Sequence, residues 1–142
     1  MGDAQISLFS FEIKIKLSFS NLRESFFQAV SNSSWAHQGY LVTANVREDR
    51  DFLIELERLS RSFGIGVLLL DLEDPDSTDE LFPPEENEVV DWDTVDKLMM
   101  NPDFREFISR VKRDVNSKEV REEWYDQINE AEEIIEFFKN RL

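Results

Sequence analysis

The stretch that decides the fold reads Ser7-Leu-Phe-Ser-Phe-Glu-Ile-Lys-Ile-Lys-Leu-Ser-Phe19. Apolar and polar residues alternate along it, which is typical of a β-strand whose two faces meet different surroundings. We therefore predict a strand over residues 8–18 with one buried face. The side chains expected on the buried face are Phe9, Phe11, Ile13, Ile15, Leu17 and Phe19, and the other face carries Ser10, Glu12, Lys14, Lys16 and Ser18.

Helical and strand patterns alternate after this strand. A helix is predicted over about residues 20–32, capped by Ser18 or Ser20, and a second over 50–63, opened by Asp49 or Asp51 and ended by Gly64. Further strands are predicted at 40–46 and 65–72. Such alternation implies adjacent parallel strands joined by right-handed crossovers. The sequence therefore predicts an α/β fold with a helical C-terminal extension.

The remainder of the chain divides into an acidic segment and three helical patterns. Residues 73–90 are rich in carboxylates and prolines and are expected to be loosely packed. Helices are predicted from Asp91 or Asp93 to about 100, from Pro102 to about 115, and over 118–141, where Ser117 would be the cap. We assign residues 1–90 to the core with its acidic loop, and residues 91–142 to a helical extension packed on the same domain. The apolar stripe of the last helix indicates either core packing or the seam of a homodimer, and consists of Val120, Trp124, Ile128, Ala131, Ile135 and Phe138.

Charge and composition exclude several classes of function. The net charge of −15 argues against this chain binding DNA unaided, since phosphate binding depends on Lys and Arg. Residues 73–106 hold two basic and thirteen acidic residues, so most of the excess lies there, either as a solvated surface or as a site for a basic partner. The absence of cysteine and the single histidine exclude disulfides and thiolate or histidine-rich metal sites. We expect a cytoplasmic protein, because neither a signal peptide nor a long apolar run is present.

Glu12 and Lys14 are the candidate catalytic residues. A spacing of two places both side chains on one face of the strand, where the carboxylate suits a hard cation such as Mg²⁺ and the ammonium suits a phosphate or an attacking water. An ordinary ion pair on an exposed strand gives the same pattern. Gln28, on the following helix, is either a third site residue or a simple exposed position. The chain contains no Gly-rich phosphate loop and no G-x-S-x-G elbow, so P-loop and serine hydrolases are disfavoured.

Several segments together resemble the HrgA-like bacterial proteins. They are Phe9-Ser-Phe-Glu-Ile-Lys14, Phe19-Ser-Asn-Leu-Arg-Glu24, Phe27-Gln-Ala-Val-Ser-Asn-Ser-Ser-Trp-Ala36, Gly39-Tyr-Leu-Val42, Ser62-Phe-Gly-Ile-Gly-Val67, Asp71-Leu-Glu-Asp-Pro-Asp76, Leu81-Phe-Pro83 and Asn101-Pro-Asp-Phe104. In that family a helix-turn-helix domain commonly precedes a restriction-endonuclease-like domain of the PD-(D/E)xK superfamily, and the family is linked to restriction-modification loci.

The resemblance implies a metal-dependent DNA endonuclease domain. Glu12 and Lys14 would match the family's Glu-x-Lys, with Glu12 as the Mg²⁺ ligand, and DNA would be the partner of the full-length protein. The family's acidic residue on the preceding strand has no match here, although Asp3 lies nine residues before Glu12. We therefore expect an N-terminally truncated chain that does not cut DNA alone. The alternative is a non-catalytic remnant that acts through protein–protein contacts.

Overall fold

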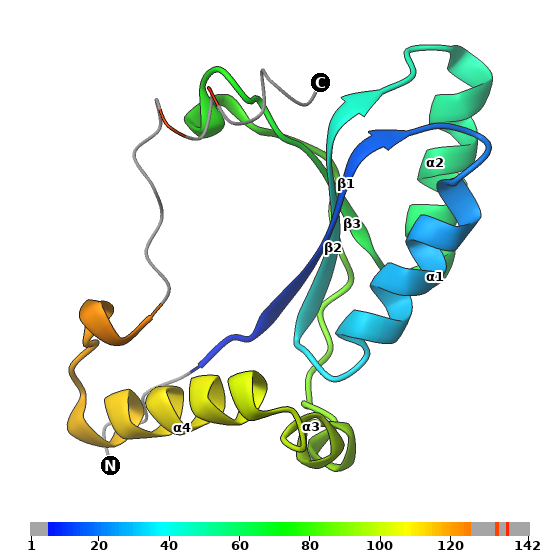
Figure 1. The fold of residues 1–142 in the computed structure, drawn as a ribbon. Coiled ribbons are helices and arrows are strands. Elements are labelled where there is room, and N and C mark those ends of the chain that lie inside the picture. Colours follow the sequence, from blue (N-terminus) through cyan, green and yellow to red (C-terminus); the bar gives the residue numbers. More distant parts are fainter. Residues whose placement is uncertain (1–5, 126–132, 134–135, 137–142) are drawn as a thin grey trace. The chain divides into compact units, whose positions relative to one another are not determined.

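The computed structural model describes residues 6–125 together with Glu133 and Glu136. Residues Ser7–Val90 form one compact unit, and the described residues outside this range belong to a second. The first unit is shown in Figure 1, where the chain passes from blue to green. Its elements are β1 (Phe9–Leu17), α1 (Leu22–Ser33), β2 (Gln38–Val46), α2 (Arg50–Phe63), β3 (Gly66–Leu69), the 3-10 turn η1 (Pro75–Ser77) and β4 (Asp79–Phe82).

The four strands form one mixed sheet in the order β1-β2-β3-β4. β1, β2 and β3 run parallel, which confirms the predicted strand–helix–strand alternation, and β4 pairs antiparallel with β3. β3 ends at Leu69 rather than at residue 72. β4 falls inside the acidic segment that was expected to be loosely packed, so that expectation was wrong for residues 79–82, which pair with Val67, Leu68 and Leu69.

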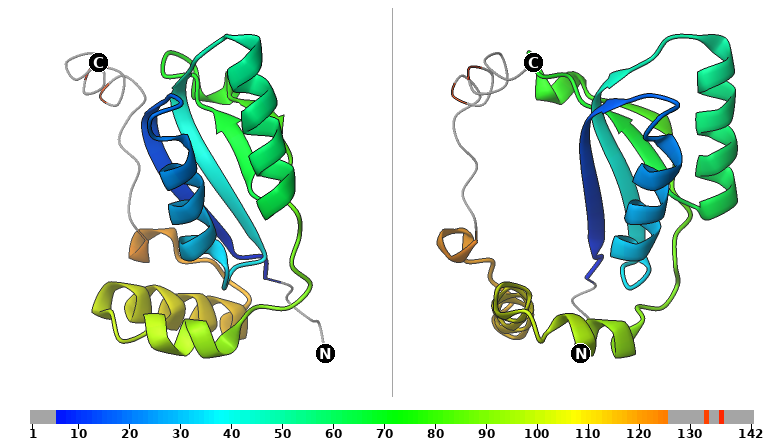
Figure 2. Two further views of the ribbon diagram at one scale, coloured as in Figure 1. Left: turned by 90° about the vertical axis from the view of Figure 1, so that its right-hand side faces the viewer. Right: turned by 45° about the vertical axis from the view of Figure 1, so that its right-hand side comes forward.

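Both crossover helices lie on the same side of the sheet. The two views in Figure 2 show α1 and α2 side by side against one face. A right-handed crossover that always steps in the same direction across a sheet places every helix on one side. The core therefore lies between this face and the two helices. Its fully buried members include Phe26 of α1, Phe52 and Leu56 of α2, Leu41 of β2 and Val67 of β3.

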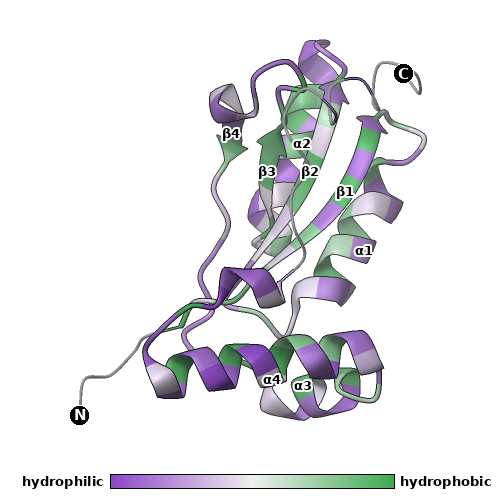
Figure 3. Cartoon of the chain, turned by 60° about the vertical axis from the view of Figure 1, so that its left-hand side comes forward, coloured by the Kyte–Doolittle hydropathy of each residue, from purple (hydrophilic) through white to green (hydrophobic). Residues whose placement is uncertain are grey.

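The buried face of β1 is the opposite of the predicted one. Phe11 is 52% exposed and Ile13 is 66% exposed, and only Leu17, at the end of the strand, is buried. The polar side chains of β1 lie instead on the side of the sheet that carries the helices. Figure 3 shows the alternation as green and purple bands along β1. The exposed apolar side chains, here called the apolar stripe of β1, are Phe9, Phe11, Ile13 and Ile15.

Local signals explain where the helices begin and end. Asp49 caps α2, accepting a hydrogen bond from the backbone N–H of Phe52 at 2.9 Å, and Gly64 ends it at a φ of 68°, both as predicted. The predicted serine cap of α1 was wrong. The helix begins after Asn21, whose side chain accepts from the Ser18 N–H and donates to the Lys16 carbonyl. Asn21 thus closes the turn between β1 and α1.

Three segments meet at His37, in the loop before β2. The backbone N–H of His37 donates to the Leu8 carbonyl at 2.9 Å, and the Leu8 N–H donates to His37 Nδ1 at 3.0 Å. The backbone N–H of Asn87 donates to the His37 carbonyl at 2.7 Å. The residue before β1 and the segment after β4 therefore both lie next to His37. His37 has a structural role here.

The second unit contains α3 (Trp92–Leu98), α4 (Pro102–Ser117) and the 3-10 turn η2 (Glu122–Trp124). Asp91 and Asn101 cap the two helices, close to the predicted starts. The prediction of a helix beginning at residue 118 was wrong for residues 118–125. Lys118 takes a left-handed conformation, and Ser117, the predicted cap, belongs to α4. The rest of that predicted helix lies outside the described residues apart from Glu133 and Glu136, and so do the members of the proposed homodimer seam that follow Trp124.

Candidate functional site

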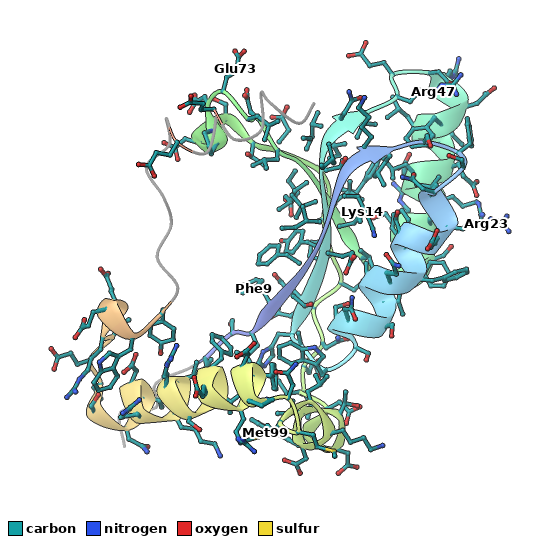
Figure 4. All side chains as sticks on the ribbon, in the orientation of Figure 1. Phe9, Lys14, Arg23, Arg47, Glu73 and Met99 are labelled. Carbon is teal, nitrogen blue, oxygen red and sulfur yellow. The ribbon has the colours of Figure 1, made fainter. Side chains whose placement is uncertain are left out.

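Glu12 and Lys14 lie together on the helix side of β1. Figure 4 shows Lys14 directed to the side that carries α1 and Phe9 directed to the opposite side. Lys14 Nζ lies 3.5 Å from Glu12 Oε1, and the two side chains are 31% and 18% exposed. Since β1 is an edge strand, this partly exposed pair stands at the border of the sheet. The spacing in the sequence predicted this juxtaposition.

Asn32 joins the pair from the last turn of α1. Its side-chain amide donates to Glu12 Oε2 at 2.7 Å, so each oxygen of the carboxylate has a different nitrogen neighbour. The Asn32 carbonyl accepts from Ser10 Oγ at 3.0 Å and from Trp35 Nε1 at 2.6 Å, which fixes the end of the helix over the strand. Sequence reasoning missed Asn32, because a Ser-Asn-Ser-Ser run reads as the end of a helix.

Gln28 lies one helical turn before Asn32, so both side chains lie on the same flank of α1. Its side-chain oxygen, Oε1, is buried and accepts no hydrogen bond among the described residues. A buried carbonyl oxygen without a hydrogen-bond donor is uncommon in folded proteins. The structure thus places all three predicted site residues on β1 and the flank of α1 that follows it.

The oxygen donors of this site match a divalent cation only in part. Glu12 supplies one carboxylate and Gln28 one carboxamide oxygen, both of the hard type that Mg²⁺ prefers. Both carboxylate oxygens of Glu12 already have nitrogen neighbours. Among the described residues, no group of three or more Asp, Glu or His side chains has the arrangement of a metal site. Asp3, the acidic residue nearest before Glu12 in the sequence, lies outside those residues.

A different arrangement occupies the other face of the sheet. The ring of Phe11 stacks on Tyr40 of β2 with centroids 5.5 Å apart, and the Tyr40 hydroxyl donates to Glu80 Oε1 of β4 at 3.2 Å. Partial burial, together with the negative charge and hydrogen bond of Glu80, raises the pKa of the Tyr40 hydroxyl above its usual value. This face is therefore apolar along β1 and acquires a carboxylate only at β4.

Comparison with protein-family models, with curated protein sequences and with solved structures found no match to this chain. Its fold is α/β, with a four-stranded mixed sheet. No helix in the part of the chain that the structure describes is both long and apolar enough to cross a membrane.

Proposed function

We propose that this chain carries half of a metal-dependent phosphodiesterase site of the restriction-endonuclease type. The observation that supports the proposal is the 3.5 Å approach of Lys14 Nζ to Glu12 Oε1 on a strand that leads through a helix into a parallel neighbour. Glu12 is the metal-ligating carboxylate and Lys14 the cation that faces the water and the phosphate. A bound Mg²⁺ supplies Lewis acidity toward the phosphate and lowers the pKa of the attacking water.

The chain's own residues have separate parts in this proposal. Lys14 offsets phosphate charge and positions the attacking water, and the amide of Asn32 holds the Glu12 carboxylate against β1. The buried side-chain oxygen of Gln28, one helical turn before Asn32 on α1, is a neutral oxygen donor. A further carboxylate has to come from outside the described residues, because one carboxylate binds Mg²⁺ weakly. Double-stranded DNA is the expected substrate of the completed site, by the resemblance to HrgA-like proteins.

A paramagnetic titration tests the proposal without relying on cleavage. We expect Mn²⁺ added to the ¹⁵N-labelled chain to broaden the amide signals around Glu12 and Gln28, and Glu12→Gln to abolish that local effect. Lys14→Gln removes the competing ammonium and should tighten Mn²⁺ binding at the same place. Broadening confined to the acidic segment 73–90, and unchanged by Glu12→Gln, would overturn the proposal.

A second candidate function is supported by the exposed apolar stripe of β1. Four apolar side chains at alternate positions, each at least 42% exposed, form a contiguous patch of the sort that marks protein–protein contacts. On this proposal the chain is a non-catalytic interaction module, and the Glu12–Lys14 ion pair is a surface feature worth at most about 1 kcal/mol. Replacing the stripe while leaving Glu12 intact separates the two functions.

A further inference from the structure

β1 is the longer of the two edge strands of the sheet. Among the residues that the structure describes, its nine residues pair with β2 and with no other strand. The Leu8 carbonyl accepts hydrogen bonds from the β2 side. Since backbone groups alternate in direction along a strand, those of Phe9, Phe11 and Ile13 point away from β2. The other edge, β4, has four residues and begins with Asp79 and Glu80, and charges on short edge strands discourage pairing.

The sequence of β1 is complementary to itself in one antiparallel register. We propose that a second copy of this chain pairs with β1 about a two-fold axis at Ile13, which joins the two four-stranded sheets into one of eight strands. In this register each Glu12 faces the partner's Lys14, at a position between the hydrogen-bonded pairs where side chains approach most closely. On the opposite face, Phe11 meets the partner's Ile15, and Ile13 meets the partner's Ile13.

The neighbouring registers are disfavoured by charge. Centring the pair on Glu12 would place two carboxylates opposite each other, and centring it on Lys14 would do the same with two ammonium groups. Like charges directly opposite destabilise a strand pair. The local charge also favours association. β1 carries one acidic and two basic residues, a net charge of +1 in a chain whose total is −15, so the two edges bring little of the chain's negative charge together.

The pairing also covers exposed apolar surface. The apolar stripe of β1 would continue across the axis as a double row of side chains contributed by both copies. The hydrogen bonds between the two strands would satisfy the outward backbone groups nearest the axis, those of Phe11 and Ile13. The inference does not depend on the proposed nuclease function, because it needs neither a metal nor DNA. It differs from a seam in the last helix, because the contact is made by β1.

Analytical ultracentrifugation of the full chain, at concentrations up to about 100 µM, tests the pairing. We expect a reversible dimer in the wild type. Glu12→Lys should raise the dimer dissociation constant by roughly tenfold or more, since it opposes Lys to Lys at two symmetric positions. The double variant Glu12→Lys/Lys14→Glu reverses both charges, keeps the ion pair within each chain, and should restore the wild-type constant to within about threefold. A wild-type monomer, or a failure of the double variant to restore the dimer, would overturn the proposal.

Two further variants test the strand and the register. Ile13→Pro removes an outward N–H that makes no bond within the sheet, so the monomer should fold and the dimer should be lost. The chain contains no cysteine, so cysteines can be introduced singly. An oxidised mixture of Glu12→Cys and Lys14→Cys should give mainly the 12–14 disulfide between copies, because non-hydrogen-bonded cross-strand positions suit disulfide geometry. A dimer unaffected by Ile13→Pro, or cross-links without preference for the 12–14 pair, would place the interface elsewhere.

Discussion

Asn32 donates its side-chain amide to Glu12 across 2.7 Å, and this bond joins the last turn of α1 to the edge strand. The same residue accepts from Ser10 and Trp35 through its backbone carbonyl, so three contacts converge on one position. Asn32 therefore determines how the carboxylate of Glu12 is held, whatever that carboxylate binds.

Replacing Asn32 by Ala should lower the free energy of unfolding by about 0.5–1.5 kcal/mol, the usual net worth of one hydrogen bond to a partly exposed group. Urea denaturation followed by far-ultraviolet circular dichroism measures the change. Ser31→Ala, at an exposed position one residue earlier on the helix, is the matched control and should have little effect. An equal loss in both variants would mean that the bond to Glu12 is not the cause of the change.

The chain alone is expected not to cut DNA at a useful rate, because Glu12 is the single carboxylate beside Lys14 among the described residues. Without a strongly activating metal site, the pKa of the attacking water stays far above neutrality, so almost no hydroxide nucleophile forms. Plasmid DNA incubated with the purified chain and millimolar Mg²⁺ or Mn²⁺ is the assay, with Glu12→Ala as control. Metal-dependent nicking that disappears in the control would show that Asp3 or a second subunit completes the site.

Tyr40 should titrate above the usual tyrosine value of 10.0, because partial burial and the Glu80 carboxylate both oppose its ionisation. A raised pKa in the folded state stabilises the fold fully below pH 10, and this contribution is lost as the pH rises through the folded-state pKa. Absorbance at 295 nm follows the ionisation. The background variant Tyr125→Phe leaves Tyr40 as the single tyrosine.

In that background, Glu80→Gln should lower the midpoint of the Tyr40 titration only in part. The largest cause of the raised pKa is desolvation, which the variant leaves in place. Replacing Tyr40 by Phe should remove the extra stability that the fold has below pH 10. The free energy of unfolding of this variant should then fall less steeply above pH 10. A midpoint that stays the same in Glu80→Gln would contradict the assignment of Glu80 as a contributor.

Phe52 and Phe11 should respond differently to truncation. Phe52 is fully buried between α2 and the sheet, so Phe52→Ala should cost about 3–5 kcal/mol of unfolding free energy. Phe11 is half exposed and keeps mainly its stacking on Tyr40, so Phe11→Ala should cost about 0.5–1.5 kcal/mol. Thermal or urea unfolding of the two variants side by side measures the contrast. Similar losses would mean that the apolar stripe of β1 is covered in solution.

The hydrophobic period of β1 determines which side chains share a face of the strand, but not which face the helices cover. Alternation along residues 8–18 correctly grouped the side chains of β1 into two sets, because a strand directs neighbours to opposite faces. It could not tell which set the helices cover. That depends on strand order, and with the order β1-β2-β3 both right-handed crossovers fall on one side.

The strand β4 was not predicted, because its sequence is rich in charged residues. Asp79 and Glu80 lie in a run of carboxylates that is typical of a solvated loop, yet residues 79–82 pair with β3 and Glu80 accepts a hydrogen bond from Tyr40. The spacing of Glu12 and Lys14 predicted their juxtaposition, since two residues apart on a strand share a face. The contact of Asn32 with Glu12 could not be predicted in this way. It depends on the packing of α1 on β1, which brings together distant parts of the chain and leaves no local pattern in the sequence.

Leu8 and Asn87 both hydrogen-bond His37, so the two ends of the first unit lie close together. Its entry and exit points both hydrogen-bond one residue, so a short linker could join residue 90 to residue 7 without disturbing the sheet. The chain could then be opened at the exposed turn around Asp74, between β3 and β4. Such a circularly permuted unit should fold with β4 as its first strand, since tolerated permutation depends on adjacent termini and an exposed site for the new ends.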